Sequence, residues 1–111
     1  MASAQSATVT VVSISDPTSP SSEATLNIAT DLATAACGNF AADSVQSVAV
    51  ATSTGYANGI MVAAAPASNP EINGYLAFYD ASSLAFLGCA EAGNKPEGIV
   101  SQGSKIACVN E

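Results

Sequence analysis

The side chains that could bind a metal ion lie near the C-terminal end of the sequence. Glu97, Asn110 and Glu111, with Asn94 nearby, carry carboxylate and amide oxygens, and such hard donors suit Ca²⁺. A calcium site takes about six to eight oxygen ligands, and these residues are too few to supply them. The alternative role for them is a solvated loop and strand end. We therefore predict that these residues alone form no metal site. If further carboxylates converged on them, Glu97, Asn110 and Glu111 would be the candidate ligands for Ca²⁺.

No group of residues in the sequence indicates catalysis. The chain has no His, which removes the commonest general base and every Ser-His-Asp or Cys-His arrangement. The spacings of Cys37, Cys89 and Cys108 match no metal motif. Small, buried cysteines are expected; one disulfide would fit, and the sequence does not choose its pair. We predict no catalytic residue and no cofactor.

Two groups of residues have both a structural and a functional interpretation. Asp16 and Asp80 each precede a serine-containing stretch, where an Asp side chain can accept hydrogen bonds from the backbone of a tight turn. The functional alternative, acid-base catalysis, would need a second carboxylate close by. Four aromatic residues crowd one predicted hairpin and should pack across strands; the alternative is an exposed platform for a sugar or peptide. These are Tyr75, Phe78, Tyr79 and Phe86.

Composition excludes several classes of partner. The chain has 111 residues, 49% of them hydrophobic, and a formal net charge of −7 with only two basic residues. Nucleic-acid binding needs a basic surface that displaces counterions, and attraction to anionic lipid fails for the same reason. The longest apolar stretch, 60–65, is far shorter than the roughly 20 residues of a membrane-spanning helix. We expect one globular domain with no nucleic-acid partner and no membrane insertion.

Short strands separated by turn residues account for most of the chain. The run 60–65 is apolar on both faces, as in a strand covered on both sides. Residues 75–80 alternate, with Leu76 and Phe78 on one face and the tyrosines on the other. A strand is expected over 22–30. Only the alanine-rich stretch 31–43 resembles a helix in composition, and we predict it as a loop with one helical turn.

An internal repeat orders these strands. The stretch 11–29 matches 75–92 as strand, Asp, serine-rich turn and strand, while 45–65 matches 96–111 as strand, glycine-containing turn and strand. One blade of a β-propeller is a sheet of four antiparallel strands, which we letter a, b, c and d in chain order. With this lettering, the predicted strands of the chain follow one another as c-d-a-b-c-d-a-b. We predict an all-β, antiparallel propeller segment over 1–111. Outer strands of one blade would occupy about 7–30, a complete blade 44–92, and inner strands of the next blade 96–111.

The ordered motifs ISDPTSP, SVQSVAVA, GIMVAAAP, GYLAFYDASS and KPEGIVSQGSKIACVNE resemble the choice-of-anchor I family. This family of secreted or surface β-propellers includes proteins named mesenchyme-specific cell surface glycoprotein and is similar to YVTN and WD40-like repeats. The chain departs from the family at 96–98, where Pro-Glu-Gly replaces Pro-Asp-Met, and at SQGSK, which replaces a Pro-Asp-Gly-Lys turn. The resemblance implies an extracellular or cell-surface location and predicts that Glu111 is an interior position of a longer protein, so that this chain is a fragment.

The expected function is non-enzymatic binding or scaffolding of an unknown protein or glycan ligand. The alternative is a fragment of a Ca²⁺-dependent phosphatase, phytase-like or esterase-like propeller enzyme, whose further acidic residues would come from other blades. A small independent β-sandwich is a third interpretation. Two half blades leave uncharged strand edges open, and such edges recruit other chains, so the isolated chain is expected to self-associate or to be only marginally stable.

Overall fold

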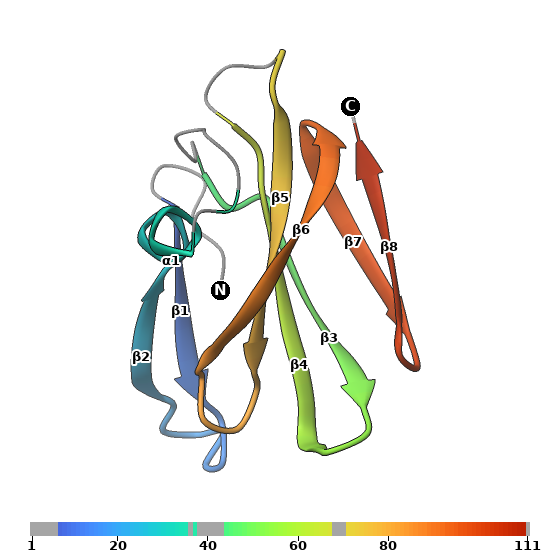
Figure 1. Ribbon diagram of the computed structural model, residues 1–111. Coiled ribbons are helices and arrows are strands. Elements are labelled where there is room, and N and C mark those ends of the chain that lie inside the picture. The colour runs from blue at the N-terminus through green and yellow to red at the C-terminus, as the bar shows by residue number, and fades with distance from the viewer. Residues whose placement is uncertain (1–6, 36, 38–43, 68–70, 111) are drawn as a thin grey trace.

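Three antiparallel sheets lie as layers in the computed structural model, which describes residues 7–35, 37, 44–67 and 71–110 (Figure 1). The first sheet is β1–β2, the second has the order β3-β4-β5-β6, and the third is β7–β8. The predicted all-β, antiparallel class is confirmed. The elements of this part of the chain are β1 (Thr8–Ser13), β2 (Ser21–Asn27), α1 (Ile28–Thr34), β3 (Ser47–Ser53), β4 (Tyr56–Ala65), β5 (Asn73–Asp80), β6 (Phe86–Asn94), β7 (Pro96–Gln102) and β8 (Lys105–Asn110).

The middle sheet is covered on both faces, and its strand β4 shows this most clearly. Met61 and Ala63 point to the first face, toward β1–β2, whereas Val62 and Ala64 point to the second face, toward β7–β8. All of the residues 61–65 are buried. The expectation of a strand that is apolar on both faces is therefore confirmed, and its small side chains let the neighbouring layers approach closely.

The larger core lies between the first face and the layer formed by β1, β2 and α1. Val9 of β1 and Ile28 and Leu32 of α1 are almost fully buried against this face. The Asn27 side chain caps the helix by accepting a hydrogen bond from the Thr30 backbone, as N-cap residues do. The expected strand over 22–30 is wrong in its last three residues, because the chain turns into α1 at Ile28, and Ile28 thereby enters the core.

The second face carries a smaller core beneath the β7–β8 hairpin. Ile99 of β7 packs there with Val62 and Leu76. Polar contacts also join the two sheets: the Ser101 hydroxyl donates to the Val50 carbonyl at 2.7 Å, and the Ile99 N–H donates to a serine hydroxyl of β3 at 3.3 Å. Strand β7 therefore lies beside β3, at the edge of the middle sheet.

The turns bear out the predicted role of the two aspartates. Asp16 Oδ1 accepts hydrogen bonds from the backbone and hydroxyl of Thr18, at 3.1 and 2.7 Å. Asp80 Oδ1 accepts from the Ser82 backbone at 2.8 Å. The glycine-containing turn expected between the strands of 45–65 is present at Thr54 and Gly55. Gly59 lies beyond it, inside β4, where its positive φ and its closeness to β3 accompany an irregularity in the strand pairing.

The aromatic residues of the β5–β6 hairpin pack inward, as predicted. The rings of Tyr79 and Phe86 meet edge to face with centroids 5.4 Å apart. Tyr75 lies against the core of the first face and Phe78 against that of the second. These contacts favour cross-strand packing over an exposed platform.

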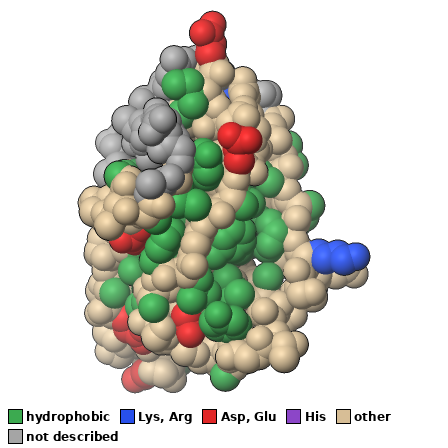
Figure 2. Space-filling model, viewed as in Figure 1, with side chains coloured by type: hydrophobic (Ala, Val, Ile, Leu, Met, Phe, Trp, Pro, Cys, Tyr) green, Lys and Arg blue, Asp and Glu red, His purple; other side chains and the backbone are tan. Residues whose placement is uncertain are grey.

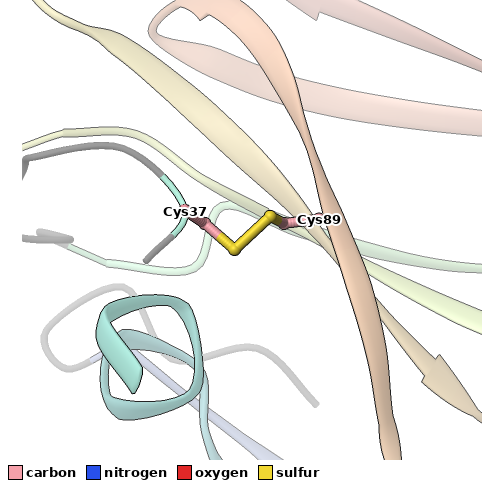
Figure 3. Close-up of a disulfide and its surroundings, with 2 residues drawn as sticks. All are labelled: Cys37 and Cys89. Carbon is pink, nitrogen blue, oxygen red and sulfur yellow. A yellow bond between two sulfur atoms is a disulfide. The ribbon is translucent and has the colours of Figure 1, made fainter. Parts of the chain in front are cut away.

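A disulfide between Cys37 and Cys89 joins the segment after α1 to strand β6 (Figure 3). Its Cα atoms are 6.3 Å apart, and the bond closes a sequence separation of 52. Both cysteines pack with the core of the first face. The bond therefore fixes the α1 layer to the middle sheet.

None of the helical residues described forms a segment long and apolar enough to cross a membrane.

Candidate functional site

A groove lined by hydroxyl groups lies where the β3–β4 turn meets the β7–β8 turn. It has a volume of about 420 Å³ and is lined by Thr52, Ser53, Thr54 and Ser104. The Thr52 N–H donates to the Gly103 carbonyl at 2.9 Å, so the two turns are joined directly through their backbones. The groove is therefore built by two hairpins that are distant in the sequence.

Local backbone conformation places these hydroxyl groups. Gly55 and Gly103 have φ values of +90° and +57°, which glycine adopts without steric cost and which the tight turns require. The pairing of β3 with β4 is irregular between Ala51 and Ser53, just before the turn, and such bulges re-aim side chains. The hydroxyl-bearing residues 52–54 line the shallow groove together with Ser104 of the other hairpin.

The chemistry of the groove is that of neutral hydrogen bonding. Serine and threonine hydroxyls donate one hydrogen bond and accept others, and no acidic residue lines the described groove. The chain holds no His to activate a hydroxyl as a nucleophile. Such a surface suits an uncharged ligand rich in hydroxyl or amide groups.

The structure places the candidate calcium ligands at the other end of the β7–β8 hairpin. Asn110 pairs with Pro96, and its side-chain amide packs against Gly93 at the end of β6. Glu97 is exposed, at an irregularity in β7. Glu111 lies outside the described residues. Within the described ranges, no three His, Cys, Asp or Glu side chains gather as a metal site would require.

A polar pair, formed by the buried Tyr79 and the half-buried Asp31, stands apart from the groove. The Tyr79 hydroxyl donates to Asp31 Oδ2 at 2.5 Å and joins β5 to α1. Burial, and then the hydrogen bond and charge of Asp31, raise the pKa of Tyr79 far above its ordinary value of about 10. The phenol is therefore protonated at neutral pH, and the pair holds the α1 layer in place.

The remaining thiol is Cys108, half-buried on β8. Burial raises the pKa of its thiol, which lowers the reactive thiolate fraction. The expectation of a small, buried cysteine is met only in part, because Cys108 is partly exposed.

Sequence reasoning did not identify the groove. The hydroxyl run at 52–54 beside Gly55, and Ser104 beside Gly103, were visible as turn residues only. Their meeting depends on how the β7–β8 hairpin docks against β3, and no local pattern encodes that docking.

The chain matches no protein-family model, no curated protein and no solved structure at a significant level.

Proposed function

We propose that this chain is a non-enzymatic binding or scaffolding segment of a secreted or cell-surface β-propeller of the choice-of-anchor I type. One observation carries the proposal: a four-stranded antiparallel sheet lies between two hairpins that pack on its opposite faces. Face-to-face stacking of four-stranded sheets is the architecture of propeller blades. Here β3 to β6 form one blade, β1–β2 an outer half and β7–β8 an inner half.

Contacts between β3 and β7 support this assignment. Both are first strands of their sheets, and in a propeller the first strands of successive blades lie side by side around the central channel. The bonds from Ser101 to Val50 and from Thr52 to Gly103 join these two strands and their turns. The hydroxyl groove then opens at the rim of the channel.

The disulfide supports the proposed location. Disulfides persist in oxidising surroundings such as the extracellular space. The Cys37–Cys89 bond spans two layers of the fold, so it stabilises the tertiary structure.

The proposed ligand of the groove is a neutral glycan or an uncharged peptide. The experiment is a titration of the isotope-labelled protein with neutral oligosaccharides and with uncharged peptides, followed by NMR. Binding should shift the signals of Thr52, Thr54 and Ser104, and the double variant Thr54→Ala/Ser104→Ala should bind about tenfold more weakly through loss of two hydrogen bonds.

The matched control is Ser19→Ala, an exposed hydroxyl in the β1–β2 turn, which should bind like the wild type. Signal changes confined to other surfaces, or equal affinities for the groove variant and the control, would contradict the assignment of the groove.

A further inference from the structure

Tyr56 is an aromatic residue that the packing of the described fold does not use. The aromatic side chains of the β5–β6 hairpin pack against the two hydrophobic cores, whereas Tyr56, the first residue of β4, packs with neither core of the described residues. Its side chain is half-exposed. A tyrosine at the surface offers a rigid apolar ring with a polar tip, and such rings supply much of the contact area in binding sites. Tyr56 is therefore a candidate contact residue for a ligand.

Strand pairing places Tyr56 beside the hydroxyl groove. Thr54 and Gly55 form the two-residue turn between β3 and β4, and Tyr56 is the direct cross-strand partner of Ser53, which lines the groove. Paired residues of antiparallel strands lie on the same face of the sheet, with Cβ atoms about 5 Å apart. Tyr56 therefore adjoins the groove on the side of Ser53.

The backbone at the groove favours a sugar over an extended peptide. An extended peptide binds by pairing its backbone with the free groups of a strand edge, but here the Thr52 N–H is already bonded to the Gly103 carbonyl. The groove instead presents side-chain hydroxyls next to an aromatic residue. Hydroxyl groups exchange hydrogen bonds with the hydroxyls of a sugar, and the C–H face of a sugar ring packs against an aromatic ring.

Charge and size restrict the sugar further. The lining residues are uncharged, and Lys105, which follows Ser104, lines the neighbouring hollow rather than the groove. The chain has a formal net charge of −7, and acidic side chains, drawn in red, are scattered over the face seen in Figure 2. Such a field repels an anionic ligand. The groove volume of about 420 Å³ lies within the range of small-ligand sites, about 300–1,000 Å³, which suits a short oligosaccharide.

We propose that the groove binds a neutral oligosaccharide and that Tyr56 selects it by packing against one of its rings. This assignment rests on the proposed function, because it chooses one of the two ligand classes named for the same groove. Sugar rings whose hydroxyls are all equatorial expose C–H groups on their faces, so β-linked glucose units fit this arrangement. One ring lies against Tyr56 while its hydroxyls reach those of Thr54 and Ser104.

Three probes of similar size test the choice of ligand. Cellotriose is a neutral trimer of β-linked glucose, trigalacturonate is an anionic trimer, and a capped triserine peptide is uncharged. In NMR titrations of the isotope-labelled protein, cellotriose should shift the signals of Tyr56, Thr54 and Ser104. It should bind about tenfold more tightly than either of the other probes. Intermolecular Overhauser effects should connect the Tyr56 ring protons of the wild type with the C–H protons of the sugar.

Two substitutions of Tyr56 separate its ring from its hydroxyl. Tyr56→Leu keeps an apolar side chain but removes the ring, and should weaken the binding of cellotriose about tenfold. Tyr56→Phe keeps the ring and should bind within about threefold of the wild type, because it loses at most one exposed hydrogen bond. Circular dichroism melts show whether both variants are folded, and the Overhauser contact tests the ring in the wild type without any substitution.

Three outcomes would overturn the proposal. These are a groove that binds the triserine peptide or trigalacturonate as tightly as cellotriose, equal affinities of the wild type and folded Tyr56→Leu for cellotriose, and bound cellotriose without an Overhauser contact to the Tyr56 ring. In each case the groove still binds a ligand, so the proposed function stands. If none of the three probes bound at the groove, both this proposal and the assignment of the groove would fail.

Discussion

Removal of the Cys37–Cys89 disulfide should cost the fold a large part of its stability. In the chain-entropy relation, a cross-link that closes a loop of 52 residues raises the free energy of unfolding by about 4 kcal/mol at 25 °C. Single domains have unfolding free energies of about 5–15 kcal/mol. The double variant Cys37→Ala/Cys89→Ala should therefore be marginally stable, with a further small loss because both residues pack with the core.

Urea unfolding followed by circular dichroism measures this difference. The comparison is between the oxidised wild type, the double variant and Cys108→Ala, which removes the unpaired thiol and should change the unfolding free energy by about 1 kcal/mol or less. The measurements belong at low protein concentration, so that self-association does not add to stability. A loss below about 1 kcal/mol in the double variant would refute the reasoning, since the cross-link would then not constrain the unfolded chain.

Three further substitutions test local features. Tyr79→Phe should lower the unfolding free energy by about 1–3 kcal/mol, because Asp31 loses its donor. Since the folded-state pKa of Tyr79 is raised, wild-type stability is intact below pH ~10 and should fall above it by up to about 1.4 kcal/mol per pH unit; urea titrations at several pH values should show this slope reduced in Tyr79→Phe. Gly59→Ala should destabilise more than Gly55→Ala in thermal melts, because both have positive φ but only at Gly59 would a new Cβ meet backbone, 2.5 Å from a carbonyl oxygen. Asn27→Ala should cost about 1 kcal/mol through loss of the α1 cap; equal stability by urea unfolding would show that the cap is redundant.

The periodicity of the side chains predicted two kinds of strand correctly. One kind is buried on both faces, and in the other the side chains alternate regularly between the two faces. Residues 61–65 and the alternation of Leu76 and Phe78 were readable because side-chain direction follows the period of two in a strand. The Asp-containing turns were also readable, because an Asp side chain bonds to backbone within its own turn. Each of these features is encoded within a few consecutive residues.

Features that depend on contacts between distant segments were not predictable. The helix α1 replaced the end of an expected strand because the Asn27 cap and the core around Ile28 and Leu32 outweigh local strand propensity. The groove likewise requires the docking of β7–β8 on β3. The disulfide pair was left open because three cysteines allow three pairings.

Covalent linkage is unequal among the three layers, and this sets the order in which they come apart. The α1 layer is tied to β6 by a disulfide, whereas β7–β8 is held by a small apolar core and a few hydrogen bonds. In a dilute, monomeric sample the last hairpin should be the unit of lowest protection in amide hydrogen exchange, opening while the rest stays closed. Uniform exchange rates across all eight strands would instead mean that the described fold opens as a single cooperative unit.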